Sequence, residues 1–124
     1  MQKFSGLTIK SIQKGLKAKD FSATEIAGHY LATIKEKDQA IGAFLEVSEE
    51  MALRQAKEVD ELVAQDVALP ALAGVPCSIK DNILIKGLHC TAGSRILENY
   101  QAVYDATVIQ HLKKEKVVFL GKTN

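Results

Sequence analysis

Tryptophan is absent from this 124-residue chain, and proline and cysteine occur only twice each. Two cysteines, Cys77 and Cys90, are too few for a disulfide framework, so we expect free thiols in a cytoplasmic protein. A formal charge of +1 argues against a broad basic surface for nucleic acid or anionic lipid. No apolar run approaches the ~18 residues of a membrane span, and the N-terminus lacks the unbroken apolar core of a signal peptide. The length and the ordinary 47% hydrophobic content indicate a soluble globular protein, either one domain or part of a larger one.

Helical periodicity dominates residues 8–65. Apolar residues recur at helical spacing from Ile9 to Leu16, with lysines on the other faces. The stretch FSATEI predicts the start of a second helix, in which Ser22 is the N-cap and Glu25 completes a capping box. The apolar stripe of this second helix comprises Ala23, Ile26, Ala27, Tyr30 and Ile34.

A short strand and a third helix complete this half. The stretch GAFLEV (42–47) alternates loosely and predicts the strand. Ser48 is expected to cap the helix that follows. The inner face of that helix would comprise Ala52, Ala56, Val59 and Val63.

Residues 66–124 change character. We expect a strand at 75–80, a second extended piece at 83–85, and a helix capped by Asp105. The run VVFL (117–120) has no polar alternation, so both of its faces should be buried in a sheet covered by helices. Strand, helix and strand in this order predict an α/β fold with a mixed or parallel sheet, whose strand order is left open.

The tripeptide GKT (121–123) resembles the end of a phosphate-binding loop. Such a loop needs a glycine five residues before the second glycine, and Lys116 occupies that position. An apolar strand also runs directly into the tripeptide, so we interpret it as a strand end and turn.

Two further clusters are weak candidates for chemistry. Cys77, His89 and Cys90 lack the paired spacing of a structural zinc site, so Cys77 is better interpreted as a small core residue. Ser94 in TAGS could be a nucleophile, but no nearby histidine is placed to activate it. A turn and helix cap is the favoured interpretation of that serine.

Lys80 closes the apolar run GVPCSIK and is the strongest candidate for chemistry. A strand-end lysine that extends into water is the simpler interpretation. The functional interpretation is a neutral lysine acting as a base, which needs a pKa lowered from ~10.4 to roughly 7–8 by desolvation or nearby positive charge. The apolar approach could desolvate Lys80, while strand alternation should direct Asp81 to the opposite side.

The combination of LAGVPCSIKDNILIKGLHCTAGSRILENY, DATVIQHLKK and VVFLGKTN resembles the amidase signature family. The resemblance is close over residues 69–124 and looser over the helical part. It implies that residues 1–124 are the N-terminal portion of a single amidase domain, mainly helical over 1–65, with the α/β core beginning at 66–124. Lys116 stands where relatives usually have glycine, at a helix end that often needs φ > 0.

The resemblance implies a Ser–cis-Ser–Lys hydrolytic site in which the family's lysine falls on Lys80. Asp81 and Asn82 match the same motif and look like supporting residues, and Gly93 and Ser94 match a turn that borders the site. In the family both serines and the oxyanion hole follow in a later Gly/Ser-rich segment. We therefore expect residues 1–124 alone to be inactive.

Within the family the residues are most similar to glutamine-hydrolysing subunits of tRNA-dependent amidotransferases. Such a resemblance implies ammonia release from glutamine, partner subunits in a heterotrimer, and tRNA engaged mainly through a partner. It implies no cofactor in this chain, with ATP and Mg bound by one of the partners. Two alternatives remain, namely a freestanding amidase and a non-catalytic interaction module.

Overall fold

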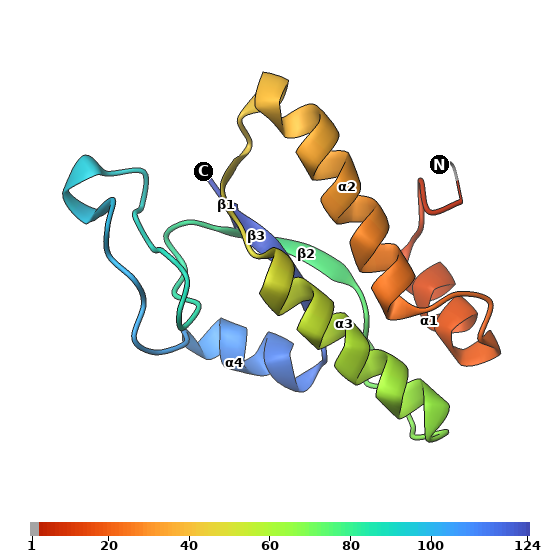
Figure 1. The fold of residues 1–124 in the computed structure, drawn as a ribbon. Coiled ribbons are helices and arrows are strands. Elements are labelled where there is room, and N and C mark those ends of the chain that lie inside the picture. The colour runs from red at the N-terminus through yellow and green to blue at the C-terminus, as the bar shows by residue number, and fades with distance from the viewer. Residues whose placement is uncertain (1–2) are drawn as a thin grey trace.

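The computed structural model describes residues 3–124, which form helices around a three-stranded sheet (Figure 1). The elements in chain order are α1 (Ile9–Ala18), α2 (Ala23–Ile41), β1 (Phe44–Val47), α3 (Glu49–Ala64), β2 (Pro76–Lys80), the 3₁₀ turn η1 (Arg95–Leu97), α4 (Thr107–Lys114) and β3 (Val118–Thr123). The sheet order is β1-β3-β2, with β3 antiparallel to β1 and parallel to β2. The predicted α/β class is confirmed, and the sheet is mixed. None of the helices in the described part of the chain is long and apolar enough to cross a membrane.

The predicted start of α2 is confirmed in detail. The Ser22 hydroxyl accepts a hydrogen bond from the Glu25 backbone N–H at 3.0 Å, and the Glu25 carboxylate accepts one from the Ser22 N–H at 2.8 Å. Two of the backbone donors that a helix start leaves unpaired are thereby satisfied. The first turn of α2 is also tied to α3, because Asp60 accepts hydrogen bonds from the backbone N–H groups of Ala23 and Thr24.

The expected cap at Ser48 is wrong in its chemistry. Ser48 occupies the N-cap position of α3, but its side chain makes no capping hydrogen bond. Its hydroxyl instead donates to the backbone carbonyl of Phe119 in β3 at 2.8 Å, at a buried position. A buried carbonyl needs a donor more than the exposed first turn of a helix does, because water can serve the latter.

The expected cap at Asp105 is also wrong. The N-cap of α4 is Ala106, and Asp105 lies one residue earlier. Its carboxylate accepts the Lys86 backbone N–H at 2.8 Å and lies 2.7 Å from the Lys113 Nζ in the last turn of α4. Asp105 therefore binds the loop after β2 to the far end of α4.

Strand β3 lies in the middle of the sheet, and its two faces contact different cores. Val118 and Leu120 belong to the core formed with α1, α2 and α3, whereas Phe119 belongs to a second core with Ile109 of α4 and Ile85. The prediction that both faces of 117–120 are buried is confirmed. The strand is longer than predicted, because it continues through GKT to Thr123, so the expected turn there is wrong. The extended piece expected at 83–85 forms no strand, although Ile85 is fully buried.

Small residues allow close approaches in both layers. Four fully buried alanines lie on the facing surfaces of α2 and α3, namely Ala23, Ala27, Ala52 and Ala56. In the sheet, a Cβ on Gly121 would lie 2.2 Å from the backbone carbonyl oxygen of Glu46 in β1. Glycine is therefore the residue that permits the close pairing of β1 with β3 at this position, where Gly121 is the register partner of Val47.

Between β2 and α4 the chain makes a long excursion from the sheet, drawn in cyan to blue in Figure 1. Its base is closed by two backbone hydrogen bonds, from the Ala102 N–H to the Leu88 carbonyl and from the Gly87 N–H to the Ala102 carbonyl. An isolated antiparallel bridge joins His89 and Gln101. The excursion carries η1 and several exposed apolar side chains, among them Ile96 and Val103. At this base, residues 89–91 lie against the end of the sheet, where the His89 carbonyl contacts Lys122 and Thr91 contacts Asp81.

Candidate active site at the carboxyl ends of β2 and β3

The parallel strands β2 and β3 end side by side. Lys80, the last residue of β2, is paired in register with Thr123 of β3. Ligand sites in open α/β sheets lie beyond the carboxyl ends of parallel strands. The three motif segments KDN (80–82), TAGS (91–94) and GKTN (121–124) meet at this edge.

Asp81 is the residue that joins these three segments. Its backbone N–H donates to the Thr123 carbonyl at 2.7 Å, which extends the contact between β2 and β3 by one residue. Its carbonyl accepts the Ala92 N–H at 2.9 Å, and its carboxylate accepts both the N–H and the hydroxyl of Thr91. Asp81 thus holds the end of β2, the end of β3 and the TAGS segment in one arrangement.

Lys122 is the partner of Asp81 inside the protein. The Nζ of Lys122 lies 3.0 Å from Oδ1 of Asp81, and the exposed fractions of the two side chains are 0% and 2%. The same Nζ donates to the His89 carbonyl at 3.0 Å. Burial raises the pKa of the Asp81 carboxyl, but hydrogen bonds from Thr91 and Lys122 outweigh it, so this pKa lies below its ordinary value. Asp81 is therefore a buried carboxylate and not a proton donor.

Glu46 connects β1 to the same network. Its carboxylate accepts the His89 backbone N–H at 2.7 Å and lies 3.3 Å from the His89 Nδ1. Glu46 is also the register partner of Lys122 across the sheet. The His89 carbonyl therefore accepts a hydrogen bond from Lys122, and the His89 N–H donates one to Glu46. These bonds complete a chain of contacts from Asp81 to β1.

Lys80 lies outside this network. Its side chain is exposed, while that of Asp81 is buried, so the two residues face opposite sides as strand alternation predicts. Asn82 is exposed as well. The described residues do not bury Lys80, so the expected desolvation by the apolar run before it is not supplied within residues 3–124.

The TAGS turn lies next to the residue that follows β3. Gly93 has φ +69, and a Cβ built on it would lie 3.2 Å from Oδ1 of Asn124. The Ser94 hydroxyl accepts the Ile96 N–H at 3.3 Å and caps η1. The interpretation of Ser94 as a turn and cap residue is confirmed.

The GKT tripeptide does not have the geometry of a phosphate-binding loop. Gly121, Lys122 and Thr123 are strand residues in register with β2. The Lys122 ammonium is fully buried and engaged with Asp81 and His89, so it cannot reach a phosphate in solvent. The sequence interpretation missed Lys122 as a structural partner, and its only local signal was a lysine directly after a strongly apolar strand.

Both cysteines are free thiols placed near the sheet. Cys77 is a partly buried residue of β2 that packs against the second core, and burial raises the pKa of its thiol. The Cys90 Sγ donates to the Asp81 carbonyl at 3.4 Å. No group of three or more His, Cys, Asp or Glu residues suited to a metal ion occurs within residues 3–124.

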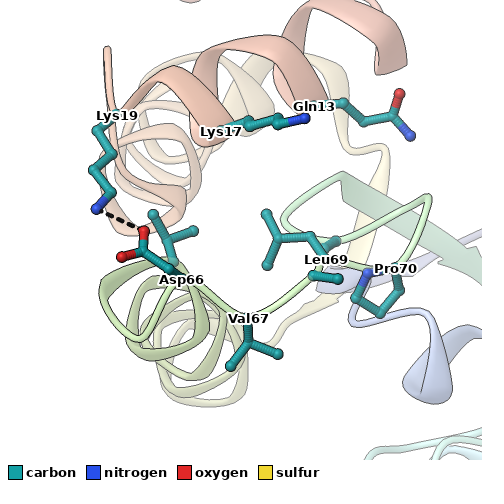
Figure 2. Close-up of a pocket in the computed structure, with 10 residues that line it drawn as sticks. Gln13, Lys17, Lys19, Asp66, Val67, Leu69 and Pro70 are labelled. Carbon is teal, nitrogen blue, oxygen red and sulfur yellow. Dashed lines mark hydrogen bonds and ion pairs between the residues drawn. The ribbon is translucent and has the colours of Figure 1, made fainter.

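A separate hollow of about 530 Å³ lies between the end of α1 and the loop after α3 (Figure 2). Figure 2 shows the Lys19–Asp66 ion pair, at 3.1 Å, on one side of it and Leu69 and Pro70 on the other. None of the residues that form the network around Asp81 lines this hollow. We therefore assign the candidate site to the strand ends and not to the hollow.

Comparisons with known proteins show which family the chain is similar to. A family model described as amidase matches residues 25–124. The A subunit of the glutamyl-tRNA(Gln) amidotransferase of Protochlamydia amoebophila is 46% identical over 125 residues, covering 100% of this chain and 25% of that protein. The same subunit of Carboxydothermus hydrogenoformans is 44% identical, covering 95% of this chain and 24% of that protein. The chain thus spans about a quarter of the length of these curated relatives.

Solved structures show the same similarity in three dimensions. The peptide amidase of Stenotrophomonas maltophilia superimposes with a TM-score of 0.92 at 27% identity, over 100% of this chain and 26% of that one. The A subunit of the glutamyl-tRNA(Gln) amidotransferase of Thermotoga maritima superimposes with a TM-score of 0.72 at 33% identity, over 100% of this chain and 24% of that one. The expected fold, an incomplete amidase signature fold, is confirmed at this level.

Proposed function

The chain belongs to the amidase family, and from that premise we propose that it is the N-terminal portion of the glutamine-hydrolysing subunit of a tRNA-dependent amidotransferase. The observation that carries the proposal is the meeting of the KDN, TAGS and GKTN segments around Asp81, with Lys80 on the open side of the strand end. Relatives 40–46% identical over most of this chain bear the name of that subunit, which supports the choice of glutamine as substrate.

In the proposed reaction Lys80 is the catalytic residue of this segment. A neutral Lys80 accepts a proton from a bridging serine, which accepts one from the nucleophilic serine as that serine attacks the amide carbonyl. The proton returns to the departing nitrogen, ammonia leaves, and water then cleaves the acyl-enzyme to release glutamate. Both serines and the oxyanion donors are proposed to come from a part of the protein outside these 124 residues, so the 124 residues alone would be inactive.

The remaining predicted residues have supporting roles in this proposal. Asp81 fixes the backbone that carries Lys80, and Asn82, Gly93 and Ser94 border the substrate side of the site. The open face of Lys80 is where the rest of the protein would pack and exclude water. That burial would supply the desolvation that the described residues do not.

The proposed partners follow from the same assignment. Ammonia released here would pass to partner subunits of a heterotrimer, which would use ATP and Mg to amidate glutamate or aspartate on tRNA. The tRNA would contact mainly one of those partners, since this chain has a formal charge of only +1. We propose a cytoplasmic location for the complex and no cofactor in this chain.

A freestanding amidase is the second candidate. The observation in its favour is the TM-score of 0.92 with a peptide amidase, which exceeds the 0.72 with the Thermotoga maritima amidotransferase protein. The sequence identities favour the opposite order, at 27% and 33%. Sequence identity bears more directly on chemistry than backbone similarity does, because one fold serves many substrates.

The test is an ammonia-release assay on the full-length protein encoded by the gene that carries these residues. Glutamine, a peptide amide and an aryl amide would be compared, with and without co-expressed partner subunits. We expect glutamine to be preferred and its hydrolysis to rise when partners are present. A preference for the peptide or aryl amide would favour the freestanding amidase, and inactivity on all three would favour the interaction module.

A further inference from the structure

The ion pair between Lys122 and Asp81 has no part in the proton transfers proposed above. A fully buried ion pair is an expensive feature, since each charge loses its hydration and the mutual attraction often does no more than offset that loss. Hydrophobic residues of similar size would hold the same strands together at least as well. The location of the pair, one residue from Lys80, suggests a more specific use.

We propose that Lys122 is a positioning residue, which acts through Asp81 to fix the direction in which Lys80 leaves the end of β2. This inference rests on the proposed function, because it takes Lys80 to be the base. It goes beyond that function in giving a role to a lysine that touches neither substrate nor reacting atoms.

The backbone contacts show how the effect reaches Lys80. Asp81 follows Lys80 directly, and its N–H donates to Thr123, the register partner of Lys80. On the other side, the Asp81 carbonyl accepts the Ala92 N–H. The peptide unit between Lys80 and Asp81 is therefore held by β3, and the next one, between Asp81 and Asn82, is held by the TAGS segment.

The side-chain contacts hold that arrangement from inside the protein. One carboxylate oxygen of Asp81 accepts two hydrogen bonds from Thr91, and the other lies 3.0 Å from Lys122. Without the ammonium, the second oxygen would be a buried acceptor with no partner, and the strand end would shift to reach water. A displacement of about 1 Å at a catalytic group can cost on the order of 10²-fold in rate.

Within the described residues, Asp81 is the carboxylate that forms an ion pair with Lys122. Among the described residues, the titratable side chains in the same network are Glu46 from β1 and His89 from the excursion, and the Glu46 carboxylate is already engaged with His89. Lys122 reaches His89 only at its backbone carbonyl. The ammonium thus has Asp81 as its ionic partner, and loss of either residue leaves a buried charge behind.

The experiment compares neutral replacements in the full-length protein, with catalysis and stability measured on each variant. The variants are Lys122→Met, Asp81→Asn and the double variant, and Asp81→Asn keeps an oxygen that can accept from Thr91. The matched control is the Lys113→Met/Asp105→Asn double variant, which removes the 2.7 Å pair at the end of α4. That pair contacts neither Lys80 nor Asp81.

We expect each single variant at the buried pair to lose stability and the double variant to regain most of it. The double variant should still show kcat for glutamine reduced at least tenfold with KM unchanged, while the control keeps its kcat. A double variant with normal stability and normal kcat would overturn the proposal, because the pair would then serve stability alone. If the neutral variants do not fold, Lys122→Arg is measured instead, because it keeps the positive charge but places it at a different distance from the backbone. Reduced kcat in folded Lys122→Arg supports the proposal, and unchanged kcat overturns it.

The proposed function itself is tested in the same assay by Lys80→Ala. Retained glutaminase activity in that variant would show that Lys80 is not the base, whatever the results for the ion-pair variants. If Lys80→Ala loses activity while the Lys122→Met/Asp81→Asn double variant keeps a normal kcat, only the positioning role of Lys122 is rejected.

Discussion

Lys80 and Asp81 are adjacent in the chain and lie on opposite sides of the strand end, one exposed and the other 2% exposed. The carboxylate beside the proposed base is therefore turned away from it and neutralised by Lys122 inside the protein. A lysine whose neighbouring carboxylate pointed the same way would be held in its charged form. The carboxylate next to Lys80 in the chain therefore makes no ion pair with it.

We predict that Lys80→Ala in the full-length protein abolishes glutamine hydrolysis, because Lys80 is the proposed base and closes the apolar strand β2. Lys86→Ala is the matched control, since Lys86 is an exposed lysine a few residues further along that binds Asp105 only through its backbone N–H. Activity is measured as ammonia released from glutamine. Equal losses in the two variants would show that positive charge in this region matters, and not the position of Lys80.

The full-length protein that contains this chain is predicted not to bind Mg-ATP at GKT. The Lys122 ammonium would have to leave Asp81 and break the pairing of β3 to reach a phosphate. Calorimetric titration of Mg-ATP into the purified protein, without partners, should show no saturable heat. A micromolar site that disappears in Lys122→Ala would contradict this prediction.

Gly121→Ala should destabilise the protein by about 2–4 kcal/mol, because the new Cβ would collide with the Glu46 carbonyl and force β1 away from β3. Gly28→Ala is the control, since Gly28 lies inside α2 with nothing within 4 Å of a built Cβ. That variant should be more stable by about 0.5–1 kcal/mol. Urea unfolding of both variants tests the pair of predictions, and destabilisation by both would argue against a local clash.

The ionised Asp105 carboxylate should stabilise the folded protein, and acid should remove that contribution by protonating it. Burial raises the pKa of its carboxyl, but the hydrogen bonds from Lys113 and the Lys86 N–H outweigh this, so the pKa is lowered on folding. A lowered folded-state pKa contributes stability that is present above the unfolded value of about 3.9 and is lost as the pH falls through the folded value. Asp105→Asn should therefore cost about 1 kcal/mol at pH 6 and less than that at pH 2. Urea unfolding at both pH values measures this, and a constant difference would contradict the prediction.

Lys116→Gly should stabilise the protein by about 1 kcal/mol. Lys116 has φ +59 at the end of α4, where its N–H donates to Lys113 and the Val117 N–H donates to Leu112. Glycine adopts this left-handed conformation without the steric cost of a Cβ, and the exposed ion pair of Lys116 with Glu58 contributes little. Lys114→Gly, within the helix, should destabilise by about 1 kcal/mol. A lower melting temperature for Lys116→Gly would contradict the argument.

The positive φ at Lys116 agrees with the expectation that this helix end suits glycine. Local rules of this kind were also sufficient for Ser22 and Glu25, because both partners of the capping box lie within one turn. They failed at Ser48 and Asp105, whose oxygens are used by groups far away in the chain. A capping pattern shows that a side chain can accept or donate locally, and packing decides whether it does.

The candidate site shows the same division. Lys80, Asp81 and the TAGS turn could be placed from their motifs, and strand alternation predicted that Lys80 and Asp81 diverge. The Lys122–Asp81 pair could not be predicted, because it depends on which strands are neighbours, and the strand order was left open. A buried lysine is also improbable on composition alone until its partner is known.

The order β1-β3-β2 also has a consequence for the time course of synthesis. Neither β1 nor β2 pairs with the other, and both pair with β3, the last of the three to be translated. At about 5–20 residues per second, β1 would leave the ribosome several seconds before any strand exists to receive it. The nascent chain must therefore keep two strands unpaired while α2 and α3 already present their alanine surfaces to each other. The helical layer is thus the part that can assemble first, and the sheet closes in a single late step on which the whole strand-end arrangement depends.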